Sequence, residues 1–198
     1  MSDIKTQRKN SIYEAVLRLV KDGKSYYSIK VSDIAKEAGI GKGTVYEYFD
    51  SRDTIISEAV VYYLGGYLEH AVELVESNDT FESRLRAVFE YIYSETDESM
   101  SVVDILFANG GISDIYSILK EPDMLNAALE AIDGYIEDLL NDAAEEGAIK
   151  PIEDMRYSSH VLKAAVSGFI FSVNPGNTKR DFETAYNNSM KLILKALN

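Results

Sequence analysis

The stretch from Ile40 to Arg52, IGKGTVYEYFDSR, gathers side chains that are suited to contact phosphate groups. It contains two glycines, a lysine, a threonine and two tyrosines. Backbone amides, ammonium groups and hydroxyls all bind phosphate oxygens. Two kinds of site use such residues: a loop that encloses a nucleotide phosphate, and a helix that lies against nucleic acid.

The pattern of a nucleotide-binding phosphate loop is absent. That loop requires Gly, four residues, and then Gly-Lys-Ser/Thr. Here Lys42 is followed by Gly43, and Lys36 stands five positions before Gly41. No predicted strand precedes the stretch, so the dinucleotide-binding pattern fails as well. We therefore expect neither a nucleotide site nor a cofactor.

The residues around the stretch predict two short helices joined by a tight turn. In VSDIAKEA, residues 31–38, the apolar side chains fall on one face of a helix. Gly39 is expected to end this helix, because glycine readily adopts the left-handed conformation. A second helix that begins near residue 41 points Val45 and Phe49 inward. Such a pair forms a helix-turn-helix, whose second helix enters the major groove of DNA.

The outward face of the second helix has the chemistry for DNA contacts. It carries Lys42, Thr44 and Tyr48, with Gly43 and Tyr46 beside them. Gly43 lets the backbone approach DNA closely, and Thr44 can contact a base edge or a thymine methyl group. The lysine and the tyrosine hydroxyls can reach phosphates or bases.

The sequence DIAKEAGIGKGTVYEYFDSRDTII resembles the signature of the TetR family of one-component transcriptional regulators. The close match runs roughly from Ser28 to Ile56, and the remainder agrees in its layout of helices. The resemblance implies a homodimer that binds a palindromic operator in double-stranded DNA. It also implies a small-molecule effector in the C-terminal domain. We expect a repressor that the effector releases from the operator. An activator is the alternative within the same class.

The resemblance also implies roles for individual residues. The groove would be contacted by Lys42, Gly43, Thr44 and Tyr46. The DNA backbone would be contacted by Tyr48 and Arg52. Ser32, on the preceding helix, matches a position that contacts DNA in some members of the family. Lys30 joins this DNA-binding set because its ammonium group could reach a phosphate.

Three residues depart from the family pattern. Lys30 stands where a serine or threonine often caps the first helix of the motif, so a cap is lost. Gly41 replaces the usual serine at the start of the second helix and removes a hydroxyl. Glu47 occupies a position that is often aromatic or basic. Its carboxylate either accepts a hydrogen bond from a cytosine amine or turns away from the groove.

Helical periodicity continues along most of the chain and predicts an all-α protein of about nine helices. There are only three prolines to interrupt it. Residues 1–52 contain ten Lys and Arg against seven Asp and Glu, whereas residues 53–198 contain ten against 26. This asymmetry predicts a mildly basic helix-turn-helix domain, 1–52, and an acidic ligand-binding and dimerisation domain, 53–198.

The two C-terminal helical segments have more apolar surface than the core of a single C-terminal domain would bury. Residues 161–171 are apolar nearly all round, and residues 182–197 carry a long apolar stripe. Their counterparts in the TetR family form a four-helix dimer interface. We therefore predict a two-fold homodimer through these segments.

Aromatic residues of the acidic domain either fill its core or line an effector site. In the TetR family the effector lies between the helices of this domain. The predicted effector-binding residues are Phe89, Tyr93, Phe107, Tyr135 and Phe169. A second hypothesis is that Asp104, within SVVDILF, selects a cationic effector.

Other classes of function find little support in the composition. The chain has no cysteine and only two histidines, so we predict no metal site. The sequence contains no nucleophile motif such as G-x-S-x-G, so we do not expect an enzyme. The N-terminus lacks the pattern of a signal peptide, and no apolar stretch is long enough for a membrane helix. We expect a cytoplasmic protein. The alternative is a helical interaction or enzymatic domain in which the helix-turn-helix is structural.

Overall fold

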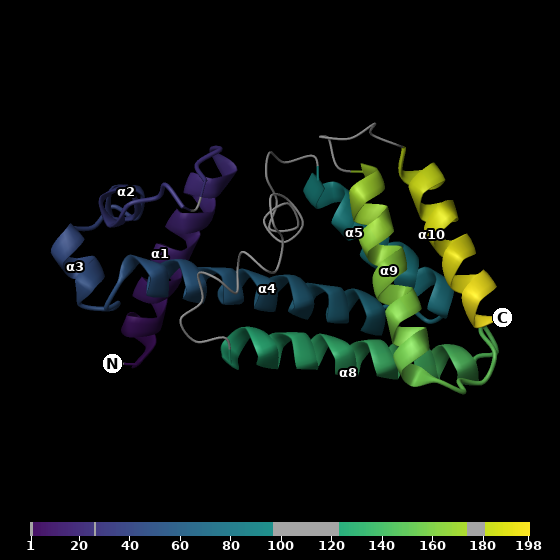
Figure 1. Cartoon of the computed structure of the whole chain (residues 1–198). Helices are drawn as coiled ribbons and strands as arrows, with labels where there is room; N and C mark the ends of the chain where they lie inside the picture. The colour runs from purple at the N-terminus through teal and green to yellow at the C-terminus, as the bar shows by residue number, and fades with distance from the viewer. Residues whose placement is uncertain (1, 26, 97–122, 174–180) are drawn as a thin grey trace. The chain divides into compact units, whose positions relative to one another are not determined.

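The computed structural model describes residues 2–25, 27–96, 123–173 and 181–198. Within these ranges the chain forms eight α-helices and no strand, which confirms the all-α prediction; the prediction of about nine helices referred to the whole chain (Figure 1). The helices are α1 Ser2–Lys21, α2 Val31–Glu37, α3 Lys42–Tyr46, α4 Arg52–Glu76, α5 Phe81–Thr96, α8 Asp123–Glu145, α9 Met155–Val173 and α10 Phe182–Leu197. None of these helices is both long and apolar enough to cross a membrane.

The contacts divide the chain into two compact units, each with its own core. The N-terminal unit contains Met1–Gly66, and the body contains Tyr67–Asp97 and Ala127–Asn198. Helix α4 therefore supplies its first turns to the N-terminal unit and its last turns to the body. The domain boundary at residue 52 remains a prediction.

The core of the N-terminal unit is built by apolar side chains that recur at helical spacing in α1 and meet the next three helices. The buried residues of α1 are Ile12, Tyr13, Ala15, Val16, Leu19 and Val20. They share a cluster with Ile34 of α2, Val45 of α3 and Ile55 of α4, each of which is fully buried. Burial of this stripe holds the two helices of the motif against α1.

The core of the body lies among α5, α8, α9 and α10. Helix α9 packs against both α10 and α5, and the three run beside one another in Figure 1. Phe89 of α5 and Phe169 of α9 are both fully buried, and their ring centroids are 4.6 Å apart. Helix α8 ends shortly before Gly147, whose φ of +75° suits glycine and reverses the chain toward α9.

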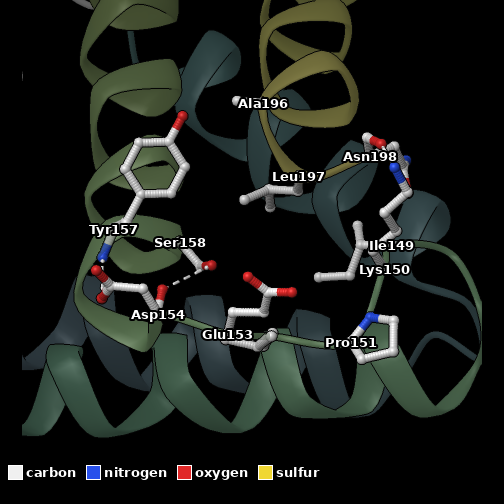
Figure 2. Close-up of a pocket in the computed structure, with 11 residues that line it drawn as sticks. Ile149, Lys150, Pro151, Glu153, Asp154, Tyr157, Ser158, Ala196, Leu197 and Asn198 are labelled. Carbon is white, nitrogen blue, oxygen red and sulfur yellow. Dashed lines mark hydrogen bonds between the residues drawn. The ribbon is translucent and has the colours of Figure 1, made fainter.

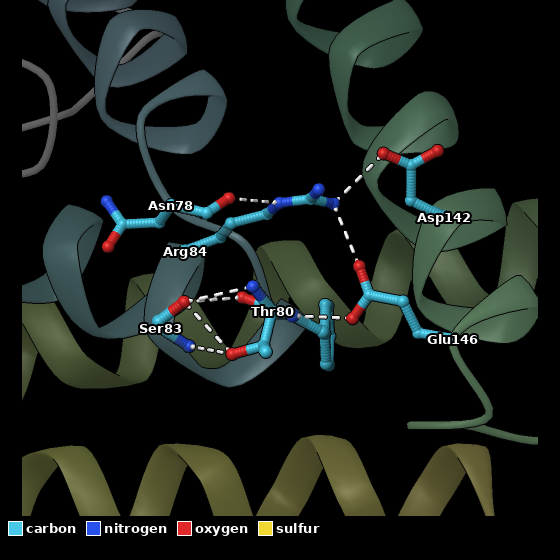
Figure 3. Close-up of polar contacts among 7 residues, drawn as sticks. Asn78, Thr80, Ser83, Arg84, Asp142 and Glu146 are labelled. Carbon is cyan, nitrogen blue, oxygen red and sulfur yellow. Dashed lines mark hydrogen bonds and ion pairs between the residues drawn. The ribbon is translucent and has the colours of Figure 1, made fainter.

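A polar network joins the first turn of α5 to the last turns of α8 (Figure 3). Arg84 donates from Nε to the carbonyl of Asn78 at 3.0 Å, and its Nη1 lies 2.9 Å from Asp142 and 3.2 Å from Glu146. Glu146 also accepts a hydrogen bond from the backbone amide of Phe81 at 2.8 Å. One arginine thus connects the turn before α5 with a carboxylate of α8 and a carboxylate just after that helix.

Candidate nucleic-acid interface and effector site

Helix α2 begins directly after Lys30, whose backbone is extended. The carboxylate of Asp33 accepts a hydrogen bond from the Lys30 amide at 3.2 Å, so Asp33 supplies a cap that the lysine side chain cannot. This bond, together with Lys24 at 3.3 Å, holds the pKa of Asp33 below its ordinary value. The side chains of Lys30 and Ser32 lie exposed at this end of the helix.

The turn between α2 and α3 has the geometry that the sequence predicts. Gly39 has a φ of +68°, which confirms that it ends α2 in the left-handed conformation. Its amide donates to the carbonyl of Lys36 at 3.2 Å, and the amide of Ile40 donates to Ala35 at 2.9 Å. These two bonds form the Schellman motif that closes a helix at glycine.

Helix α3 places its apolar residues inward, as predicted. Gly41 is its N-cap, with an extended backbone and no side chain to accept a hydrogen bond. Val45 has no exposed surface, and Phe49, which lies just beyond the helix, is 3% exposed. The amide of Phe49 donates to the carbonyl of Val45, so one further helical hydrogen bond follows α3 and keeps Phe49 on the same inward side as Val45.

The other side of α3 presents the predicted DNA-contacting residues. Lys42, Gly43 and Tyr46 are exposed, and Thr44 is partly buried. The Lys42 ammonium lies 5.9 Å from the centroid of the Tyr46 ring, so these two side chains are neighbours on one surface. Tyr46 is 49% exposed and is therefore not a core residue. Tyr48 is partly buried and packs against the core.

Gly43 has no evident role inside the N-terminal unit. A methyl group built at this position would have no atom of another side chain or element within 4 Å. Glycine in a helix costs about 1 kcal/mol relative to alanine, less near a helix end. The fold would therefore tolerate a side chain here, and the vacant space faces outward, where a partner could approach.

The structure places Arg52 differently from the other predicted DNA contacts. Its Nε donates to the carbonyl of Ile29 at 2.7 Å, and its Nη1 lies 2.7 Å from the carboxylate of Asp53. Its side chain is 27% exposed. A DNA-backbone contact by Arg52 remains a prediction, but the guanidinium already binds groups of its own chain. A carbonyl partner leaves no signal in residue types, so the sequence could not reveal it.

A second link between helices also has no signal in the sequence. Glu58 of α4 accepts hydrogen bonds from the Tyr13 hydroxyl at 2.5 Å and from the Lys9 ammonium at 2.8 Å, both on α1. Burial, and then the bond to Glu58, raise the pKa of Tyr13. The Lys9 ammonium also lies 4.8 Å from the centroid of the Phe49 ring. These contacts fix α4 against α1 behind the helix-turn-helix.

Three of the predicted effector residues are connected through ring contacts in the core of the body. Phe89 contacts Phe169, and Phe182 contacts both Phe169 and Tyr93, with ring centroids 5.9 Å and 5.5 Å apart. Tyr135 is 48% exposed on α8 and makes none of these ring contacts. Phe107 lies outside the described residues. Effector binding by these side chains remains a prediction.

A pocket of about 350 Å³ lies near the end of α10 and the start of α9 (Figure 2). The Tyr157 ring, Leu197 and the Glu153 carboxylate surround it, along with the loop of residues 149–154. None of the four predicted effector residues within the described ranges lines it. In the described part of the chain, no group of three or more His, Asp or Glu side chains could hold a metal ion.

Comparison with known sequences places the helix-turn-helix in a family. The sequence model of the family described as bacterial regulatory proteins, tetR family, matches residues 22–59, which contain α2, α3 and the start of α4. The fatty acid metabolism regulator protein of Bacillus subtilis strain 168 is 22% identical over 189 residues, which is 94% of each chain. An uncharacterized HTH-type transcriptional regulator of the same organism, YhgD, is 24% identical over 178 residues, 89% of this chain and 90% of its own.

Comparison with solved structures extends the similarity in fold to nearly the whole chain. The transcriptional regulator FadR from Bacillus subtilis, in complex with stearoyl-CoA, has a TM-score of 0.71 at 19% identity and covers 95% of this chain and 98% of its own. NemR of Escherichia coli, in its reduced form, has a TM-score of 0.75 at 16% identity and covers 94% and 97%. The family match thus covers the helix-turn-helix at residues 22–59, and the similarity to solved transcriptional regulators shows a shared fold over nearly the whole chain.

Proposed function

We propose that this chain is a ligand-responsive transcriptional repressor that binds a palindromic operator as a homodimer and leaves it when a small molecule binds the body. The outward surface of α3 carries this proposal, because Lys42 and Tyr46 are exposed there around a glycine that the fold does not require. If the motif were only structural, neither the bare position at Gly43 nor the exposed Tyr46 would have an explanation.

The proposed DNA contacts fall into two groups. Thr44, Tyr46 and the backbone at Gly43 would meet base edges in the major groove. Phosphate contacts would come from the exposed Lys30, Ser32 and Lys42 and from the Tyr48 hydroxyl. Glu47 is exposed beside this surface and is available to accept a hydrogen bond from a cytosine amine. The phosphate contacts would mainly set the affinity for DNA, and the base contacts would set the sequence preference.

The proposed dimer interface rests on an apolar face that the body leaves uncovered. Ala164, Gly168 and Phe171 of α9 are exposed and follow one another at helical spacing. Phe171 is 70% exposed, and Leu192 of α10 is 48% exposed. A methyl group at Gly168 would meet no atom within 4 Å, so another helix could approach closely. A second copy of the chain would bury this face and pair two recognition helices with a two-fold symmetric site.

Long-chain acyl-CoA is the effector class that we would test first. The proteins that suggest it are the Bacillus subtilis fatty acid metabolism regulator and the FadR structure that holds stearoyl-CoA. The body also offers partly buried apolar side chains from three helices, which suit a hydrocarbon chain. They include Val72 of α4, Val88 and Ile92 of α5, and Ile132 and Ile136 of α8. A cationic effector selected by Asp104, which lies outside the described residues, is the alternative.

The proposed mechanism is a shift between two states of the dimer. An effector that binds one state more tightly favours it, and in that state α4 would hold the two recognition helices at a separation that does not fit the operator. DNA and effector then weaken each other's binding by the same factor. A coupling free energy of about 1 to 3 kcal/mol gives a change of roughly 5- to 150-fold in operator affinity.

The test begins with selection from random DNA duplexes by the purified protein. The dissociation constant of the enriched duplex is then measured by fluorescence anisotropy, with and without stearoyl-CoA. We expect the dissociation constant to rise by about 5- to 150-fold with stearoyl-CoA and to stay unchanged with CoA alone. Failure to enrich any duplex would contradict the proposal that the protein is a DNA-binding regulator. If a duplex is enriched but its dissociation constant does not change with stearoyl-CoA, only the proposed effector class is contradicted.

A further inference from the structure

We propose that Arg52 is a positioning residue, which transmits movement of the first turn of α4 to the start of α2 through a single peptide group. The resemblance to the TetR family instead predicts a contact between this residue and a DNA phosphate. The link itself is a property of the N-terminal unit. Its consequence for operator binding rests on the proposed function.

The Arg52 side chain connects two elements of the motif. It is the first residue of α4, and its Nε donates to the carbonyl of Ile29 at 2.7 Å. Ile29 is 1% exposed and directly precedes Lys30, the N-cap of α2. A charged donor on a carbonyl makes one of the stronger hydrogen bonds in proteins. The start of α4 is therefore bonded to the residue that introduces α2.

The same peptide group is bonded on its other side to α2. The Ile29 carbonyl and the Lys30 amide belong to one planar unit, which moves as a rigid body. The Lys30 amide donates to the carboxylate of Asp33, in the first turn of α2, at 3.2 Å. If a displacement of Arg52 rotates this plane, the amide moves away from Asp33. The cap of α2 thus depends on the position of α4.

Both ends of this connection are held by ion pairs. Asp53 lies 2.7 Å from the Nη1 of Arg52, and Lys24 lies 3.3 Å from the carboxylate of Asp33. The polar path therefore runs from Asp53 through Arg52 and the peptide to Asp33 and Lys24. Helix α2 packs against α3, so a change at the start of α2 reaches the recognition helix.

The two roles for Arg52 predict different results. A phosphate contact depends on the positive charge and matters only when DNA is bound. A positioning role requires a donor to the Ile29 carbonyl and matters in the free protein as well. Hydrogen exchange of single backbone amides distinguishes these roles without DNA.

The first measurement is amide hydrogen exchange of the free protein by NMR. In Arg52→Gln we expect the Lys30 amide to exchange about three- to tenfold faster, because the bond that orients its peptide is weakened. Amides in the middle of α1, such as that of Val16, should keep their rates, which a general loss of structure would not allow. Arg52→Lys retains a charged donor, which makes a stronger hydrogen bond than the neutral amide of glutamine, and should restore part of the protection. Unchanged exchange at Lys30 in Arg52→Gln would overturn the proposal.

The second measurement is the salt dependence of binding to the enriched duplex. Lys42→Gln should reduce the slope of log K against log salt concentration by about one, as the loss of one phosphate contact does. Arg52→Gln should lower the affinity and leave the slope unchanged, and a slope reduced by about one would overturn the proposal.

If the wild-type protein binds no duplex, the proposed function is wrong, but the exchange rates of the free protein still test whether Arg52 orients the peptide between Ile29 and Lys30. If Arg52→Gln does not fold, Asp53→Asn should accelerate the same Lys30 amide, and an unchanged rate there would also overturn it.

Discussion

Arg84 in the body and Arg52 in the N-terminal unit make the same kinds of contact at the starts of consecutive helices. Each donates from Nε to a loop carbonyl, and each places Nη1 beside a carboxylate. Arg84 is 17% exposed and binds the carboxylates of Asp142 in α8 and of Glu146 just after it, far along the chain (Figure 3). Arg52 is 27% exposed, and its carboxylate partner is the next residue. The body's arginine thus fastens distant helices together, whereas Arg52 connects the motif to α4 through one peptide group.

The largest predicted effect tests whether the body forms the proposed dimer and whether operator binding requires it. Phe171→Glu places a charge in the exposed apolar face of α9 and should convert the dimer into a folded monomer. Operator affinity should then fall by at least about 100-fold, because two linked reading heads bind far more tightly than one. Light scattering and fluorescence anisotropy measure the two changes. Ala131→Glu, at an exposed position of α8, is the matched control. A dimer that survives Phe171→Glu would contradict the proposed interface.

The second prediction compares the two arginines directly. Arg84→Met should lower the free energy of unfolding by about 2 kcal/mol, because it removes the hydrogen bond to the Asn78 carbonyl and the ion pairs with Asp142 and Glu146. Arg52→Met should lower it by less than half as much, since its ion pair is local and more exposed. Urea denaturation followed by circular dichroism provides both values. Equal losses in the two variants would remove the distinction between a fastening and a positioning arginine.

The third prediction separates reading from folding within the N-terminal unit. Gly43→Ala should leave the free energy of unfolding unchanged or raise it by up to about 1 kcal/mol, because alanine favours helices and nothing in the unit is in its way. Operator affinity should fall about tenfold, since the methyl group would occupy the space proposed for DNA, at a cost comparable with one lost base contact. Gly66→Ala is the control, because a methyl group also has open space there. Retained operator affinity in Gly43→Ala would show that DNA does not approach this position.

The smallest predicted effect concerns the start of α3. Gly41 has a φ of −71°, which any residue adopts, and a Cβ there would lie 3.8 Å from the Thr44 hydroxyl, an ordinary contact. Gly41→Ser should therefore supply the missing cap and raise stability by about 0.3 kcal/mol. Gly39→Ser, at a φ of +68°, should instead lower stability by about 1 kcal/mol or more. Thermal melts compare the two variants, and a loss of stability in Gly41→Ser would contradict the cap assignment.

Local patterns predicted the helix-turn-helix well because short-range geometry determines most of it. The spacing of Val45 and Phe49 fixes which side of α3 faces inward, and the burial of both side chains confirms it. Gly39 could be placed in the turn because few other residues adopt its conformation. The link through Arg52 could not be predicted, since any residue supplies a backbone carbonyl.

The effector site was harder to predict because pocket walls and cores use the same side chains. Phe89 and Phe169 have the aromatic character expected of an effector site, yet they are fully buried against each other. Tyr135 has the same character and is exposed on α8. Residue type reports the affinity of a side chain for apolar surroundings, and only packing decides whether another side chain or a ligand provides them.

The most direct test of the account is the affinity of Tyr46→Ala for the duplex that the wild-type protein selects. Tyr46 is 49% exposed at the end of α3, so its removal should leave folding intact, as circular dichroism can verify. If α3 reads DNA, the dissociation constant measured by fluorescence anisotropy should rise about tenfold or more. An unchanged dissociation constant in a folded Tyr46→Ala variant would contradict the assignment of this surface to DNA.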